Sequence, residues 1–157
     1  MLRALGFYEA VFIASAILFN LLIAGIFIAD KRGSRKGIQL LGIAWLSLAI
    51  PLGIVFVHYV TAGAPGWVLA AFGLVFVYML VELLLDYILK YDFRKLWSTH
   101  IPYILLEYMA LFSLIGIAIW IDEGWSWLVS ASFWILMGCL IYLYAGRRRQ
   151  QPSSPVD

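Results

Sequence analysis

Five long apolar runs, joined by short polar segments, limit what this chain can fold into more than any other feature. Each run is long enough to cross a hydrocarbon core about 30 Å thick, because a helix rises about 1.5 Å per residue. No alternating strand pattern competes with them. The pattern therefore predicts an all-α, polytopic integral membrane protein, a five-transmembrane-helix bundle. Its helices are expected at about residues 5–29, 37–60, 67–90, 100–121 and 125–145.

The composition agrees with this class. Hydrophobic residues make up 64% of the chain and charged residues only 13%, whereas a water-soluble domain is about half apolar and a quarter charged. We expect a single membrane domain over 1–146, followed by a basic and then disordered tail over 147–157. The expected location is the cell membrane, as a multi-pass protein.

The basic residues predict the orientation of the bundle. With alternating helices, ten of the eleven lysines and arginines fall on one side, and only Arg3 falls on the other. Positive loops stay in the cytoplasm, so the N-terminus is expected outside and the C-terminus inside. Tryptophans fall near both expected interfaces, as an aromatic belt does: Trp67, Trp120, Trp125 and Trp127 at the outer one and Trp97 at the inner one.

Proline and glycine mark the expected helix boundaries. Pro51 lies inside the second run, where neighbouring helices or water can satisfy the freed carbonyl. Ser98 or Thr99 is expected to cap the fourth helix, with Pro102 in its first turn. The segment 122–124, Asp-Glu-Gly, is expected to separate the last two helices.

The third and fourth helices carry carboxylates within or beside their apolar runs. Glu82, Asp86 and Lys90 are spaced four residues apart and therefore share one helix face. Glu82 and Glu107 each lie about 12 Å below the cytoplasmic boundary, on helices that a short loop makes antiparallel neighbours. The candidate residues for binding a ligand, an ion or a proton are Glu82, Asp86, Glu107, His100, Tyr103 and Tyr78.

Two interpretations of this acidic region remain open. Two carboxyl groups that share a dry site do not both ionise, so the pair could hold a proton, bind a cation with Asp86, or act as acid and base. Alternatively, Glu82 and Glu107 join the helices through hydrogen bonds to Tyr78 and Tyr103, while Asp86 pairs with a nearby basic residue.

Three further polar residues lie in the first two runs. Glu9 and His58 are expected at similar depth on the outer side, where they could form an ion pair. Asn20 falls near the middle of the first run and is expected to form a hydrogen bond with another helix.

Several chemistries are disfavoured by the residues present. A single cysteine excludes an intrachain disulfide and a cysteine-cluster metal site, and two histidines on opposite sides disfavour haem and zinc, so no metal is predicted. The chain has no phosphate-binding glycine loop and no hydrolase or metalloprotease motif. Its basic residues form short juxtamembrane clusters, which do not support nucleic-acid binding. The cofactor remains unknown.

The sequence favours a non-enzymatic membrane protein. It would be an accessory subunit of a larger membrane complex, or a binder of a lipid or other hydrophobic ligand. Its expected partners are the lipid bilayer and either a larger membrane complex or further copies of itself. The alternative is a membrane-embedded enzyme or proton-coupled carrier for an apolar substrate, which would use Glu82, Asp86 and Glu107.

Overall fold

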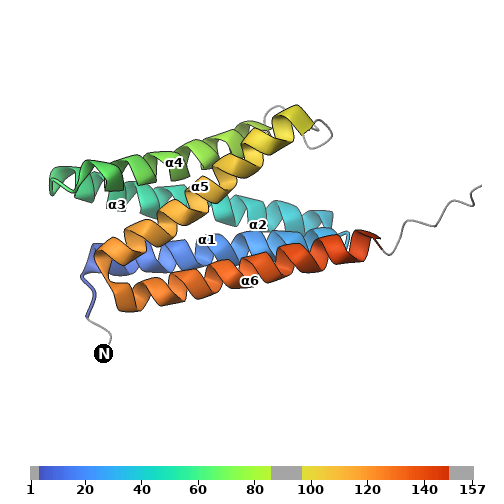
Figure 1. The fold of residues 1–157 in the computed structure, drawn as a ribbon, viewed down its shortest axis with the longest axis horizontal. Coiled ribbons are helices and arrows are strands. Elements are labelled where there is room, and N and C mark those ends of the chain that lie inside the picture. Colours follow the sequence, from blue (N-terminus) through green and yellow to red (C-terminus); the bar gives the residue numbers. More distant parts are fainter. Residues whose placement is uncertain (1–3, 86–96, 149–157) are drawn as a thin grey trace, which may run out of the picture.

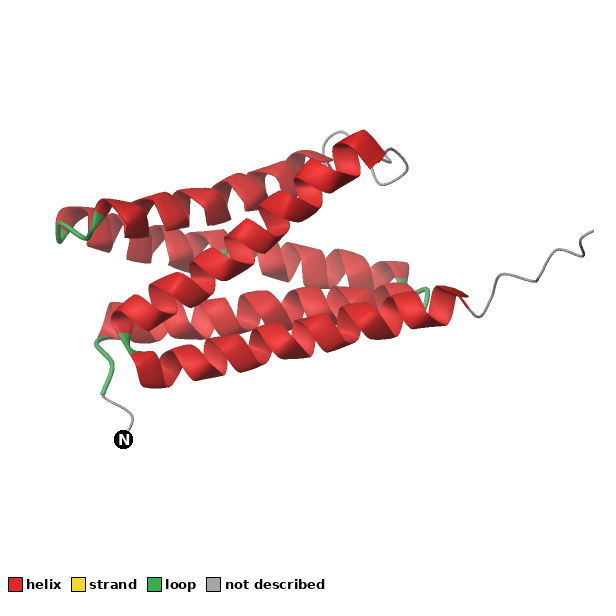
Figure 2. Ribbon diagram, viewed as in Figure 1, coloured by secondary structure: helices red, strands yellow, loops and turns green. Residues whose placement is uncertain are grey.

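The structure is a computed structural model that describes the backbone of residues 4–85 and 97–148, and the side chains of residues 4–85 and 101–143. Every regular element in these ranges is a helix (Figure 2). Five spans are long and apolar enough to cross a membrane, which confirms the predicted number of spans. The helices are α1 (Phe7–Lys31), α2 (Arg35–Ser47), α3 (Ala49–Thr61), α4 (Gly66–Glu82), α5 (Trp97–Ile121) and α6 (Glu123–Arg148).

The second predicted run forms two helices, α2 and α3, rather than one. Pro51 has no backbone N–H, so the carbonyl of Ser47 loses the donor that it would have in a continuous helix. At this point the helix tightens, and the N–H of Leu48 bonds to the carbonyl of Trp45, three residues earlier, at 3.1 Å. α2 and α3 nevertheless follow each other closely enough to form one span, Arg35–Thr61.

The first turn is shorter than the polar segment suggests. Gly33 adopts a left-handed conformation with φ of 66°, which ends α1 and lets the N–H of Ser34 reach the carbonyl of Ala29 at 3.0 Å. The hydroxyl of Ser34 then accepts the N–H of Gly37 at 3.3 Å and caps α2. The basic residues around this turn therefore lie at the ends of two helices.

The later boundaries differ from the prediction in three places. α4 is α-helical only to Glu82, with wider turns through Leu85, and the rest of the predicted range 67–90 lies outside the described residues. α5 begins at Trp97, so Ser98 and Thr99 lie within it and Pro102 is beyond its first turn. α6 begins at Glu123 because the Asp122 carboxylate accepts the N–H of Trp125 at 3.0 Å.

The end of α6 also differs from the prediction. The helix continues through Arg148, beyond the expected end at 145 and into the segment expected to be a tail. The remainder of that segment, 149–157, lies outside the described residues.

α1 lies at the centre of the bundle (Figure 1). It packs along α6 on one side and along α2 and α3 on the other. α4 packs chiefly on α5, which crosses the bundle at an angle and joins α4 to α6 (Figure 1). Most of the buried side chains between these helices are aliphatic, but the largest fully buried ones are aromatic and include Phe12, Phe19, Phe72 and Tyr78. The outward faces expose many large apolar side chains, as expected for helices that face lipid.

Candidate functional site

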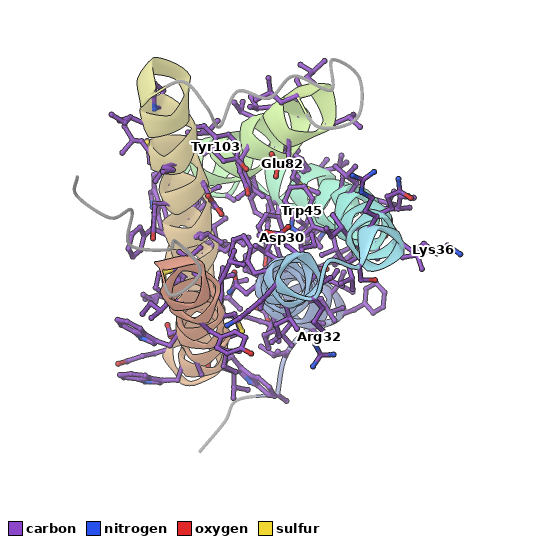
Figure 3. All side chains as sticks on the ribbon, turned by 90° about the vertical axis from the view of Figure 1, so that its right-hand side faces the viewer. Asp30, Arg32, Lys36, Trp45, Glu82 and Tyr103 are labelled. Carbon is purple, nitrogen blue, oxygen red and sulfur yellow. The ribbon has the colours of Figure 1, made fainter. Side chains whose placement is uncertain are left out.

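A side-chain hydrogen bond between α4 and α5 joins a tyrosine to a carboxylate. The hydroxyl of Tyr103 on α5 donates a hydrogen bond of 2.8 Å to Oε2 of Glu82 on α4. Both side chains are half-buried, and they lie between the two helices in Figure 3. The bond therefore joins α4 to α5 near the last turn of α4.

A second tyrosine extends this link into the core. Tyr78, one turn before Glu82, is only 2% exposed, and its ring centroid lies 6.0 Å from that of Tyr103. The Tyr78 ring therefore lies beside the hydrogen bond between Tyr103 and Glu82.

Glu107 belongs to the same group of residues. It is half-buried on α5, one turn after Tyr103. Both Glu82 and Glu107 lie within electrostatic range of the hydroxyls of Tyr78 and Tyr103. The structure thus brings together four of the six predicted residues, and we call these four the tyrosine–carboxyl cluster.

The other two candidates cannot be placed in the same way. Asp86 lies outside the described residues, and His100 lies in α5 but its side chain is not described. Within the described ranges, no group of histidine, cysteine and acidic side chains could hold a metal ion.

Trp45 on α2 lies beside the cluster, and the sequence analysis did not single it out. It is 2% exposed, and its ring packs edge-on against Tyr78 with centroids 5.5 Å apart. Its indole nitrogen has no hydrogen-bond partner in the described part of the chain. Tryptophan favours the membrane interfaces, so its position well inside the second run could have marked it as a packed residue.

The cluster combines hydrogen-bond donors and acceptors in an otherwise apolar layer. Its carboxyl oxygens can accept hydrogen bonds or share a proton, and the unpaired indole N–H of Trp45 can donate to a ligand oxygen. The same contacts also hold α4 against α5. The geometry is therefore compatible with a binding role and with a structural role.

Glu9 and His58 lie at the end of the bundle opposite the tyrosine–carboxyl cluster. Oε2 of Glu9 accepts the backbone N–H of Gly6 at 2.8 Å and so satisfies the start of α1. The ring of His58 stacks on Tyr8 with centroids 3.8 Å apart. Tyr8 and His58 also line a shallow groove between α1 and α3 with a volume of about 620 Å³. The expected ion pair between Glu9 and His58 stays a prediction.

Asn20 forms the interhelix hydrogen bond that its position predicts. Its Nδ2 donates to Oγ of Ser132 on α6 at 2.8 Å and to the carbonyl of Val129 at 3.4 Å. The Ser132 hydroxyl also donates a hydrogen bond to the same carbonyl, at 2.7 Å. Asn20 is 1% exposed, so this contact lies inside the seam between α1 and α6.

Replacing Asn20 with leucine tests the strength of this contact. Leucine has the same branching but no hydrogen-bond donor, so we expect the free energy of unfolding to fall by about 0.6 kcal/mol, the average for such bonds in membrane proteins. Reversible unfolding in mixed micelles measures the change. Ser132→Ala should have a similar effect. The double variant should lose less unfolding free energy than the two single variants lose together. A leucine variant at least as stable as the natural chain would contradict this contribution.

Comparison of the chain with protein-family models, curated proteins and solved structures gave no match. The arguments about function below therefore rest on the chain's own residues and geometry.

Proposed function

We propose that this chain is a small, non-enzymatic, multi-pass protein of the cell membrane that acts as an accessory subunit of a larger membrane complex. The five apolar spans support insertion in the bilayer. The basic residues at the turn between α1 and α2 support a cytoplasmic location for that end, with the N-terminus outside.

The outer face of α6 supports docking to a partner. Trp127, Trp134 and Ile141 recur every seven residues and are about 70% exposed, at 71%, 70% and 69%. This spacing places them on one side of the helix. We call these three residues the α6 outer face. A seven-residue repeat of large apolar side chains is the pattern by which one helix packs along another.

Trp134 is the observation that carries the proposal. It lies eleven residues after Glu123, which is about 16 Å along α6 and therefore near the middle of a span. Its indole N–H has no hydrogen-bond partner within the described ranges, and tryptophan is enriched at the interfaces rather than at mid-depth. A transmembrane helix of a partner would cover the ring and could offer an acceptor to the N–H.

Native mass spectrometry after gentle extraction from the chain's own membrane tests this docking. We expect a stoichiometric partner with the natural chain and its loss in Trp134→Leu, because a central tryptophan at an interface typically contributes at least about 2 kcal/mol. Trp67→Leu is the matched control, since Trp67 on α4 is also exposed, at 52%, but belongs to another face.

Three outcomes would contradict this proposal. The first is the absence of a stoichiometric partner from the natural chain. The second is equal loss of the partner in the Trp134→Leu and Trp67→Leu variants. The third is a complex made only of copies of this chain, which would make α6 a self-association face rather than the contact of an accessory subunit.

A second function is favoured by the tyrosine–carboxyl cluster. Four polar side chains on α4 and α5, beside the unpaired indole N–H of Trp45, could bind an apolar substrate with a polar end or transfer its proton. In that case the chain would be a membrane-embedded enzyme or a proton-coupled carrier. The substitutions at Glu82 described in the Discussion distinguish this function from the structural role.

A further inference from the structure

A second groove lies at the cytoplasmic end of the seam between α1 and α6. It has a volume of about 380 Å³, and its apolar part is lined by Ile28, Ile135 and Gly138. Two cations, Lys31 and Arg32, also line the groove, and the remaining lining residues are Cys139 and Tyr142. None of the seven lining residues is acidic. The groove thus combines a basic end with an apolar channel.

The two cations differ in how they are held. Lys31 Nζ donates to the backbone carbonyl of Tyr142 at 2.8 Å and lies 3.0 Å from the centre of the Tyr142 ring. Lys31 therefore keeps a fixed position between α1 and α6. Arg32 is exposed, and its guanidinium has no partner among the described residues. Lys31 is therefore held by Tyr142, whereas the guanidinium donors of Arg32 are available to a ligand.

Among the described residues, no acidic side chain lines this basic end. Asp30, the nearest acidic residue along the chain, is exposed and does not line the groove, and Figure 3 shows it on the side of α1 opposite Arg32. Lys36 projects from α2 away from both. Of the basic residues around the turn, Lys31 and Arg32 therefore give the groove its positive charge.

We propose that this groove binds one anionic phospholipid, with its phosphate at Lys31 and Arg32 and an acyl chain along Ile28, Ile135 and Gly138. Guanidinium donors match phosphate oxygens in a paired geometry, and basic pockets between helices on the cytoplasmic side suit anionic headgroups. The apolar channel below the cations favours a lipid over free phosphate. The inference rests on the proposed membrane insertion and is independent of a partner at the α6 outer face.

Native mass spectrometry of the purified chain in detergent tests the site with two lipids of identical acyl chains, phosphatidylglycerol and phosphatidylcholine. We expect one phosphatidylglycerol bound per chain in preference to phosphatidylcholine. Arg32→Gln should weaken phosphatidylglycerol about fivefold, the typical effect of one basic residue near an anionic headgroup. Lys36→Gln is the matched control and should leave the affinity unchanged, because Lys36 does not line the groove.

A second pair of variants tests the acyl channel. A side chain added at Gly138 meets no atom within 4 Å, so Gly138→Leu can enter the groove without disturbing α6 and should weaken both lipids. Gly53→Leu is the control, because Gly53 has equally open space but lines the groove at the other end. Circular dichroism should show unchanged helicity in all four variants.

The inference is overturned by any of three results. Equal effects of Arg32→Gln and Lys36→Gln would mean that only general surface charge attracts the lipid. Displacement of phosphatidylglycerol by millimolar inorganic phosphate, with no effect of Gly138→Leu, would mean that the cations bind a free anion. No preference between the two lipids would remove the basis for a specific headgroup site.

Discussion

Replacing Trp45 with alanine should destabilise the bundle by about 3–5 kcal/mol, the usual range for removing a large buried aromatic side chain. Trp45 is 2% exposed, and its ring lies 4.9 Å from Phe19 and 5.5 Å from Tyr78, measured between centroids. Truncation therefore leaves a cavity where α1, α2 and α4 meet. Reversible unfolding in mixed micelles, followed by helicity, measures the loss.

Trp45→Phe separates packing from hydrogen bonding at the same position. Phenylalanine keeps an aromatic ring against Phe19 and Tyr78 and removes an indole N–H that has no partner in the described part of the chain. We expect this variant to lie within about 1.5 kcal/mol of the natural protein, as conservative core exchanges do. A loss as large as that of Trp45→Ala would show that the N–H is bonded in the membrane, and would strengthen the ligand-binding alternative.

The second large effect is expected at the bond between Tyr103 and Glu82. Glu82→Leu removes the carboxylate that accepts the Tyr103 hydrogen bond, and we expect the free energy of unfolding to fall by about 1–3 kcal/mol, the cost of removing one partner of a buried polar pair. Glu82→Gln keeps a carbonyl oxygen in the same place and should lose much less. Tyr103→Phe combined with Glu82→Leu should cost less than the two separate losses together, because both members of the pair are then absent. The unfolding assay used for Trp45 measures each variant.

The same variants decide between the two functions. For an accessory subunit, Glu82→Gln should keep both the fold and the partner in native mass spectrometry, and Glu107→Gln should behave alike. For an enzyme or a carrier, the double variant Glu82→Gln, Glu107→Gln should leave the bundle intact but remove activity or proton coupling. An amide side chain cannot act as a general acid or base at neutral pH. If Glu82→Leu caused no loss of stability, the bond between Tyr103 and Glu82 would have no structural role.

Much of the fold followed from the sequence because it depends on local properties. The length and apolarity of each run determine whether a helix can span a bilayer, and neither requires knowledge of the neighbours. The five spans and the all-helical class were predicted for that reason. The pairing of Asn20 with another helix was also predictable, because an amide at mid-depth in an apolar run needs a partner. The partner, Ser132 on α6, was not.

The helix boundaries were predicted less well, for identifiable physical reasons. The missing N–H of Pro51 divides α2 from α3, whereas Pro102 is accommodated within α5. The Asp122 side chain caps α6 and allows it to begin at Glu123, although the same three residues were expected to separate the helices over a longer segment. Capping and proline effects depend on the angle at which the chain leaves each helix, and that angle is set by packing.

The sequence predicted part of the candidate site, and tertiary structure decided the rest. The spacing of Tyr78 and Glu82 places them on one helix face, and the short connection predicted that Tyr103 and Glu107 would lie opposite them. The sequence by itself thus determined the all-helical class and the five apolar spans, and its six candidates included the four residues of the tyrosine–carboxyl cluster. Only tertiary structure brought Trp45 beside that cluster, left Trp134 uncovered on α6 and formed the groove at Arg32. These features depend on the angles and rotations of helices packed against one another, which residue order along a single helix does not specify.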